Sequence, residues 1–205
     1  MESKELLSTP EALGSYCQIC EDACDRAEQI LQEQEAPSEI TSLARQVLFY
    51  ATYLAQFDHL LNAAYLATKR MADCLFDHPR LLLEIKELEL DILYDVEAQS
   101  PYSMCITTDL QAEVDRLRAN IQAADEGRFD DIVTDSHLRH DPVEWTKAFE
   151  DVIDEAEHRA YAALTDVPRG MGFCFAYWQA RRQALSELGI EWRSPGAMNP
   201  HVLFD

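Results

Sequence analysis

The residues from Ser38 to Phe76 form a stretch without glycine or proline that is long enough for one very long helix or two shorter ones. Mostly apolar side chains recur along it at alternating spacings of four and three residues: Leu43, Val47, Tyr50, Leu54, Phe57, Leu61, Ala64, Thr68, Met71 and Leu75. Such a repeat places a continuous apolar row on one side of a helix. A second row widens that side and consists of Phe49, Tyr53, Leu60 and Ala67. The width predicts neighbouring helices on several sides, as in a helical bundle.

The length of this stretch indicates that it contains a break. A single helix over the whole stretch would extend over roughly 58 Å. A compact globule of 205 residues has a diameter of roughly 40–45 Å. Because such a helix would protrude and expose its apolar row, we expect a break near Gln56 to His59 and an antiparallel pair of helices. The alternative is one long protruding helix, which would imply a partner or a dimer.

Periodic apolar rows also occur before and after the central pair. Thr9-Pro10 and Asp141-Pro142 each combine a capping side chain with a proline at the first helical position. Gly189 stands just past the last expected helix, which is the usual place for a terminating glycine. The further expected helices cover residues 10–36, 81–99, 108–126, 142–167 and 173–188.

Residues 190–205 are rich in turn-forming residues and are not expected to form a helix. They also include Ile190, Trp192 and Phe204, which are too apolar for a tail in water, so we expect the tail to pack on the helices. Strand signals are almost absent. The sequence therefore predicts an all-α fold, a single domain (residues 1–205) built as an irregular bundle of about six to eight helices with a packed, non-helical C-terminal tail.

Acidic residues outnumber basic residues by 38 to 17, which gives a net charge of −21. This charge repels phosphate backbones and anionic lipid headgroups, so we expect no nucleic-acid partner and no membrane partner. The charge is uneven, because residues 168–205 carry a net +1 and residues 1–167 a net −22. We therefore distinguish an acidic helical bundle (1–167) from a terminal helix with its packed tail (168–205).

The first five residues are polar, and charged side chains interrupt the apolar runs of the chain. We therefore expect no signal peptide and no membrane span, but a cytoplasmic protein whose six cysteines are thiols. Cys17, Cys20 and Cys24 lie on the apolar row of the first helix, at the spacing of a metal or redox motif. Because no second Cys-x-x-Cys pair exists, we favour packing in the core over chemistry for these thiols.

Glu155 and His158 suggest a metal site as an alternative. They have the one-turn spacing used in carboxylate-bridged di-iron bundles, where two such pairs come from different helices. This chain has a single pair, so His59, His137 and His140 would have to supply further ligands for a divalent metal. Side chains that converge inside the bundle would favour this interpretation, and isolated positions that face solvent would count against it.

The C-terminal region combines arginines with aromatic side chains, a composition typical of binding hot spots. The candidate binding residues are Arg169, Tyr177, Trp178, Arg181, Trp192 and Arg193. They suggest a pocket for a small anion or an acidic peptide. The interpretation that we favour is that the arginines pair with the acidic bundle and hold the tail in place.

The same region carries a series of short motifs: Gly172-Phe173-Cys174, Tyr177-Trp178, Gly189-Ile190-x-Trp192-x-Ser194-Pro195, Met198-Asn199-Pro200 and Val202-x-Phe204-Asp205. These motifs resemble the ending of an uncharacterised family of bacterial helical proteins. The resemblance covers about the last thirty-five residues. It implies an all-helical cytoplasmic protein, and it implies no activity, cofactor or catalytic residue.

Together these observations predict a non-catalytic cytoplasmic interaction or regulatory protein that needs no cofactor. Its partner would be a protein or a small anionic ligand bound near the C-terminal segment. No catalytic Ser/His/Asp order and no phosphate-binding loop is present in the sequence, which argues against an enzyme. The alternative function is a metal-dependent helical-bundle enzyme with a carboxylate and histidine site around Glu155 and His158.

Overall fold

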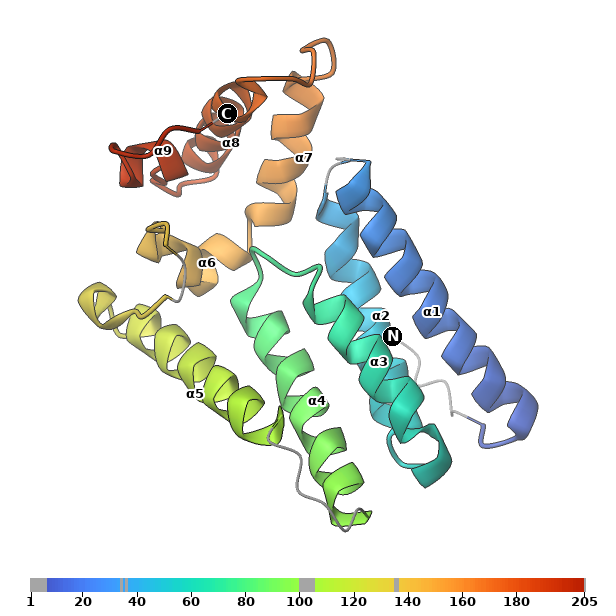
Figure 1. Cartoon of the computed structure of the whole chain (residues 1–205). Coiled ribbons are helices and arrows are strands. Elements are labelled where there is room, and N and C mark those ends of the chain that lie inside the picture. The colour runs from blue at the N-terminus through green and yellow to red at the C-terminus, as the bar shows by residue number, and fades with distance from the viewer. Residues whose placement is uncertain (1–6, 34, 36, 100–105, 135–136, 205) are drawn as a thin grey trace.

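The computed structural model describes residues 7–33, 35, 37–99, 106–134 and 137–204. Nine α-helices and no β-strand occur within these residues, so the prediction of an all-α fold is confirmed. The first five helices form an up-and-down bundle in which each helix contacts the next along the chain (Figure 1). They are α1 (Pro10–Gln32), α2 (Ile40–Leu54), α3 (Leu61–Ala72), α4 (Pro79–Gln99) and α5 (Ile106–Asp125). Short 3-10 turns η1 (Pro37–Glu39), η2 (Asp58–Leu60) and η3 (Phe129–Asp131) flank them.

The break predicted inside the central stretch is confirmed, and it lies between α2 and α3. Helix α2 ends at Leu54, and the backbone of Phe57 is extended, with φ −120° and ψ 113°. The amide of Gln56 donates to the carbonyl of Tyr53 and that of Phe57 to Leu54, at 3.2 and 3.1 Å. These hydrogen bonds between residues three apart pair the last carbonyl groups of the helix, so the helix ends without glycine or proline.

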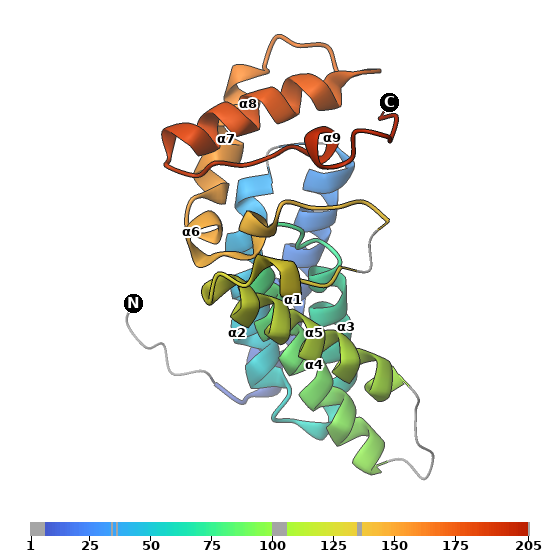
Figure 2. The same ribbon diagram turned by 90° about the vertical axis from the view of Figure 1, so that its left-hand side faces the viewer.

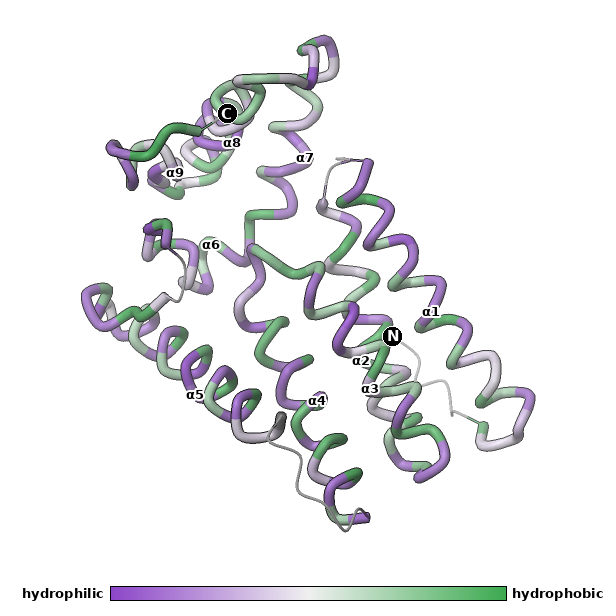
Figure 3. The backbone as a smooth tube through the Cα atoms, in the orientation of Figure 1, coloured by the Kyte–Doolittle hydropathy of each residue, from purple (hydrophilic) through white to green (hydrophobic). Residues whose placement is uncertain are grey.

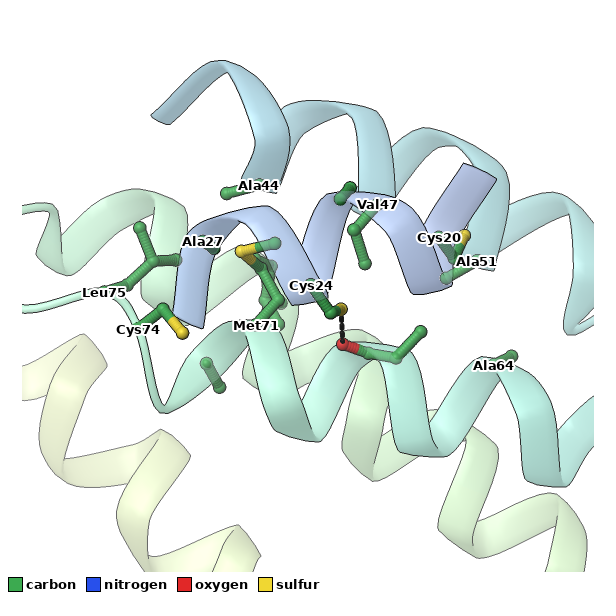
Figure 4. Close-up of a cluster of buried hydrophobic side chains, with 14 of the residues drawn as sticks. Cys20, Cys24, Ala27, Ala44, Val47, Ala51, Ala64, Met71, Cys74 and Leu75 are labelled. Carbon is green, nitrogen blue, oxygen red and sulfur yellow. Dashed lines mark hydrogen bonds between the residues drawn. The ribbon is translucent and has the colours of Figure 1, made fainter. Parts of the chain in front are cut away.

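Small side chains bring α1, α2 and α3 close together in the main core. Ala27, Ala44, Ala51 and Ala64 are fully buried there (Figure 4). Larger side chains from the same helices and from α4 fill the space around them, and the core contains Ile30, Val47, Leu54, Met71, Leu81 and Ile85. Hydrophobic and hydrophilic segments alternate along each helix of the bundle, as expected for helices that each bury one side (Figure 3). Helix α5 covers α4 through a smaller apolar cluster.

The cysteines that resemble a metal or redox motif lie at this core. Cys20 and Cys24 are buried, Cys17 is half-buried, and the Sγ of Cys24 donates to the carbonyl of Ala67 at 3.5 Å (Figure 4). Cys74 is buried nearby. Their role as packing side chains, which we favoured from the sequence, agrees with this position.

We expect Cys20, Cys24 and Cys74 to stay unmodified when the native protein is treated with iodoacetamide at about pH 8, and to react after unfolding in urea. Burial raises the pKa of Cys20 and of Cys24 to about 12 and that of Cys74 to about 11, so little thiolate forms. Peptide mass spectrometry measures the modification, with half-buried Cys174 as the internal reference. Equal rates at Cys24 and Cys174 would contradict the prediction.

The C-terminal unit, residues 142–204, packs as a separate layer. Helix α8 lies across the end of the bundle with the tail beside it (Figure 2). Its elements are η4 (Pro142–Trp145), α6 (Lys147–Glu150), α7 (Ile153–Ala163), α8 (Phe173–Glu187) and α9 (Pro195–Met198). A second core joins η4, α6, α7, α8 and the segment before α9, and it is centred on Phe149, Ile153, Leu185 and Trp192. The change in packing therefore falls near residue 142, earlier than the change in charge at residue 168.

Two expectations for this unit are wrong. The helix predicted over residues 142–167 is interrupted, because Thr146 has an extended backbone and its side chain accepts from the amide of Phe149, which starts α6. The tail is not wholly non-helical, since Ser194 caps the single turn of α9.

Gly196 lets this turn approach α8, because a Cβ there would lie 3.2 Å from the Trp178 ring. Trp192 is buried as expected, whereas Leu203 is 96% exposed.

Candidate functional site

A cavity of about 200 Å³ lies where the C-terminal unit meets the bundle. One wall comes from the end of α1, the start of α2 and the connection between α3 and α4, and the other comes from α7 and α8. The lining residues are Leu31, Pro37, Ile40, Cys74, Leu75, Phe76, Asp77, His78, Ile153, Asp154, Glu157, Tyr161 and Tyr177. Apolar walls with a few converging polar groups are typical of small-molecule sites.

A buried charge network centred on Arg181 borders this cavity. The side chain comes from α8, and its residue is only 8% exposed. Its Nη2 donates to Asp77 Oδ1 at 2.8 Å, and its Nε lies 3.1 Å from Glu157 Oε1. The guanidinium stacks on the rings of Trp192 and Phe149, at 4.9 and 5.7 Å from their centroids. Two carboxylates and two aromatic rings therefore surround one positive charge.

Tyr177 completes the network from one turn before Arg181. Its hydroxyl lies 2.7 and 2.8 Å from the two carboxylate oxygens of Glu157, to which it donates, and it accepts from Arg181 Nη1 at 3.4 Å. Burial raises the pKa of Glu157, and the charge of Arg181 opposes this rise. Burial also raises the pKa of the Tyr177 hydroxyl. Burial disfavours the charge of Arg181, but Asp77 and Glu157 outweigh it and raise the pKa of the guanidinium.

A second polar group consists of Thr41, His78 and Asp154, of which His78 and Asp154 line another part of the cavity wall. The Thr41 hydroxyl donates to Asp154 Oδ1 at 3.0 Å, and His78 Nε2 lies 3.1 Å from the same oxygen. His78 Nε2 is also 3.0 Å from Thr41 Oγ1. These contacts join α2, the start of α4 and α7, so the cavity is held by polar contacts between both layers of the fold.

The predicted binding residues make contacts within the chain, and two of the arginines, Arg181 and Arg193, pair with acidic side chains, as the interpretation that we favoured from the sequence expects. Arg193 Nε and Nη2 bond the Asp141 carboxylate, each at 3.1 Å. Arg169 donates to the carbonyl of Glu33 at 3.3 Å and stacks on Tyr161. Tyr177 and Arg181 belong to the network at the cavity, and Trp192 covers Arg181. Trp178 does not line the cavity and packs against Phe175 and Phe204.

The predicted metal ligands are not brought together. His59 lies at the turn between α2 and α3, at the opposite end of the bundle from α7 (Figure 1). Glu155 and His158 are exposed on α7, and Glu155 pairs with Arg159 at 2.7 Å. His137 and His140 are exposed, and His140 Nδ1 lies 3.2 Å from Glu144. Across the ranges given above, no cluster of three or more His, Cys, Asp or Glu side chains is placed to hold a metal ion.

A second cavity of about 220 Å³ lies between α4, α5 and η4, with Phe76, Arg116, His140 and Trp145 in its lining. None of its charged side chains is fully buried. We therefore take the first cavity as the candidate site, because strongly perturbed, buried ionisable groups mark functional sites more often than exposed ones do.

Sequence reasoning missed Thr41, Asp77, His78, Asp154 and Glu157. For Glu157 a signal was present, because it falls on the apolar row of α7 with Ile153, Ala156 and Ala160, all of them buried. An acid on such a row indicates a buried carboxylate that needs a partner. The Glu-x-x-His spacing instead drew attention to the exposed side of the same helix.

Comparisons with protein-family models, with curated proteins and with solved structures found no match to this chain. The resemblance of the C-terminal motifs to a family of bacterial helical proteins thus stays a prediction. Among the described residues, no helix combines the length and the apolar character needed to cross a bilayer.

Proposed function

We propose that this chain is a cytoplasmic, non-catalytic regulatory protein that binds a small molecule in the cavity between the bundle and the C-terminal unit. The observation that carries this proposal is the cavity itself, whose walls come from both layers and include buried ionisable groups. The net charge of −21 supports a partner other than nucleic acid.

A binding role fits the chemistry of the lining better than a catalytic one. Cys74 is the thiol among the described residues of the lining, and burial raises its pKa to about 11, so it is a poor nucleophile. Both oxygens of Glu157 lie within hydrogen-bond distance of the Tyr177 hydroxyl. That carboxylate is therefore used to hold α7 and α8 together.

Regulation follows from the position of the cavity. A ligand that contacts Leu31 and Ile40 on one side and Asp154 and Tyr161 on the other adds contacts between the bundle and the C-terminal unit. A ligand that binds the folded chain and not the unfolded chain stabilises the fold, and this stabilisation grows with the logarithm of the ligand concentration once the site is mostly occupied. Occupancy would thus tighten the C-terminal unit on the bundle, and a protein partner could respond to that state.

We expect some fragments of up to about ten non-hydrogen atoms to bind the full chain weakly, as their size allows. Ligand-observed NMR with neutral, cationic and anionic fragments measures the binding. Leu31→Phe, which adds volume inside the cavity, should weaken the signal at least fivefold. Leu66→Phe, the same substitution at an exposed position of α3, should leave it unchanged. Failure of every fragment class to bind, or equal binding by both variants, would overturn the proposal.

A further inference from the structure

We propose that the ligand of this cavity is an organic ammonium ion with a compact apolar body. This inference rests on the proposed function, because it names the chemical class of the small molecule that the cavity binds. Three features of the cavity suit such a ligand: the negative charge of the lining, its acceptor oxygens and its apolar walls.

Acidic side chains predominate among the ionisable groups of the lining. Within the part of the chain that the structure describes, Asp77, Asp154 and Glu157 line the cavity together with His78, and no lysine or arginine does. Arg181 lies behind the wall and is shared by Asp77 and Glu157, so one positive charge faces two negative ones. The contacts of Asp154 are to a hydroxyl and an imidazole. The site therefore retains negative charge that a ligand cation would neutralise.

Acceptor oxygens remain for the cation. Asp77 and Asp154 each use Oδ1 for their contacts within the chain, and the second oxygen of each has no partner in the described part of the structure. Both side chains are partly accessible, at 25% and 39%. A primary ammonium has three donors and no acceptor, which matches carboxylate oxygens.

The remaining walls suit a hydrocarbon body. Leu31, Pro37, Ile40 and Ile153 are apolar and lie along the cavity. Its volume of about 200 Å³ exceeds the roughly 150 Å³ of an apolar cavity that takes up benzene. A six-membered ring that carries one ammonium group therefore fits the available space.

The same features disfavour the two other kinds of charged ligand. An anion would meet three carboxylates and, among the lining residues that the structure describes, no lysine or arginine. A bare metal ion needs several ligands at short distance, and no such group of three exists among the residues that the structure describes.

The test uses three probes with one ring and different charge: cyclohexylammonium, cyclohexanol and cyclohexanecarboxylate. Their dissociation constants for the full chain are measured by ligand-observed NMR at constant ionic strength. We expect cyclohexylammonium to bind at least tenfold more tightly than cyclohexanol, and the carboxylate to bind more weakly still. Asp154→Asn keeps an acceptor for the Thr41 hydroxyl. It should weaken the binding of cyclohexylammonium at least fivefold and the binding of cyclohexanol less than twofold.

Asp130→Asn is the matched control, because it removes the same charge from an exposed position of η3. It should change neither constant by more than a factor of two. If the alcohol or the carboxylate binds as tightly as the ammonium, or if Asp130→Asn acts like Asp154→Asn, the ammonium assignment is wrong while a small-molecule site remains. If no probe or fragment of any charge binds, the proposed function fails as well.

Discussion

Replacement of Arg181 by methionine is expected to lower the free energy of unfolding by about 3–5 kcal/mol, because it leaves buried carboxylates without their cation. Glu157 is 2% exposed, and the charge that faces it in the native chain is that of Arg181. Asp77 loses a 2.8 Å bond from the same side chain. Methionine fills much of the volume between Trp192 and Phe149. The loss in free energy of unfolding therefore comes mainly from the removed positive charge.

The pH dependence of this loss separates charge from packing. Burial already raises the pKa of Glu157, and removal of Arg181 removes the charge that opposes the rise. A carboxyl whose folded pKa is raised stabilises the fold below its unfolded pKa of about 4.3, and this contribution is lost as the pH rises through the folded value. The deficit of the variant should therefore be largest at neutral pH and shrink toward about pH 4.

Urea denaturation at several pH values measures this deficit. Arg182→Met is the control, because Arg182 is the exposed neighbour on α8, and we expect it to change the free energy of unfolding by less than about 0.5 kcal/mol. A deficit of Arg181→Met that is small, or that does not vary with pH, would show that the network contributes little to the fold.

The sequence predicts the helices of the bundle well, because each of them buries one continuous row. The break between α2 and α3 and its position near Phe57 agree with the prediction from length, although the backbone hydrogen bonds that end α2 there involve no glycine or proline that would mark the break in the sequence. The interruption at Thr146 could not be predicted from the sequence. A threonine can lie inside a helix or cap the start of a new one, and the neighbouring residues here do not distinguish the two cases. Thr146 acts as a cap because the chain has to turn there for the Phe149 side chain to be buried in the second core, and this is a tertiary contact.

The candidate site is harder to predict than the fold because its residues are far apart in the chain. Arg181 was identified from composition, but its partner Asp77 lies 104 residues earlier. Asp154 and His78 are 76 residues apart, and neither belongs to a motif. Single-sequence patterns report neighbours on one helix, whereas these contacts depend on how α7 and α8 are placed against the bundle (Figure 2).

Replacement of Trp192 by alanine is expected to cost about 3–5 kcal/mol of unfolding free energy, because a large aromatic side chain would leave a cavity in the second core. Trp192 is 3% exposed, stacks on Arg181 and donates from Nε1 to Glu144 Oε1 at 2.6 Å. Deletion of residues 190–205 should cost at least as much. Leu203→Ala changes a side chain that is 96% exposed and should cost less than about 0.5 kcal/mol.

A double-mutant cycle between Arg181→Met and Trp192→Ala then measures how strongly the tail and the charge network depend on each other. We expect a coupling energy of about 1–2 kcal/mol, because the guanidinium and the indole are in contact and both are buried. Urea denaturation of the two single variants and the double variant gives this value. If the two losses simply add, the tail and the network stabilise the chain independently.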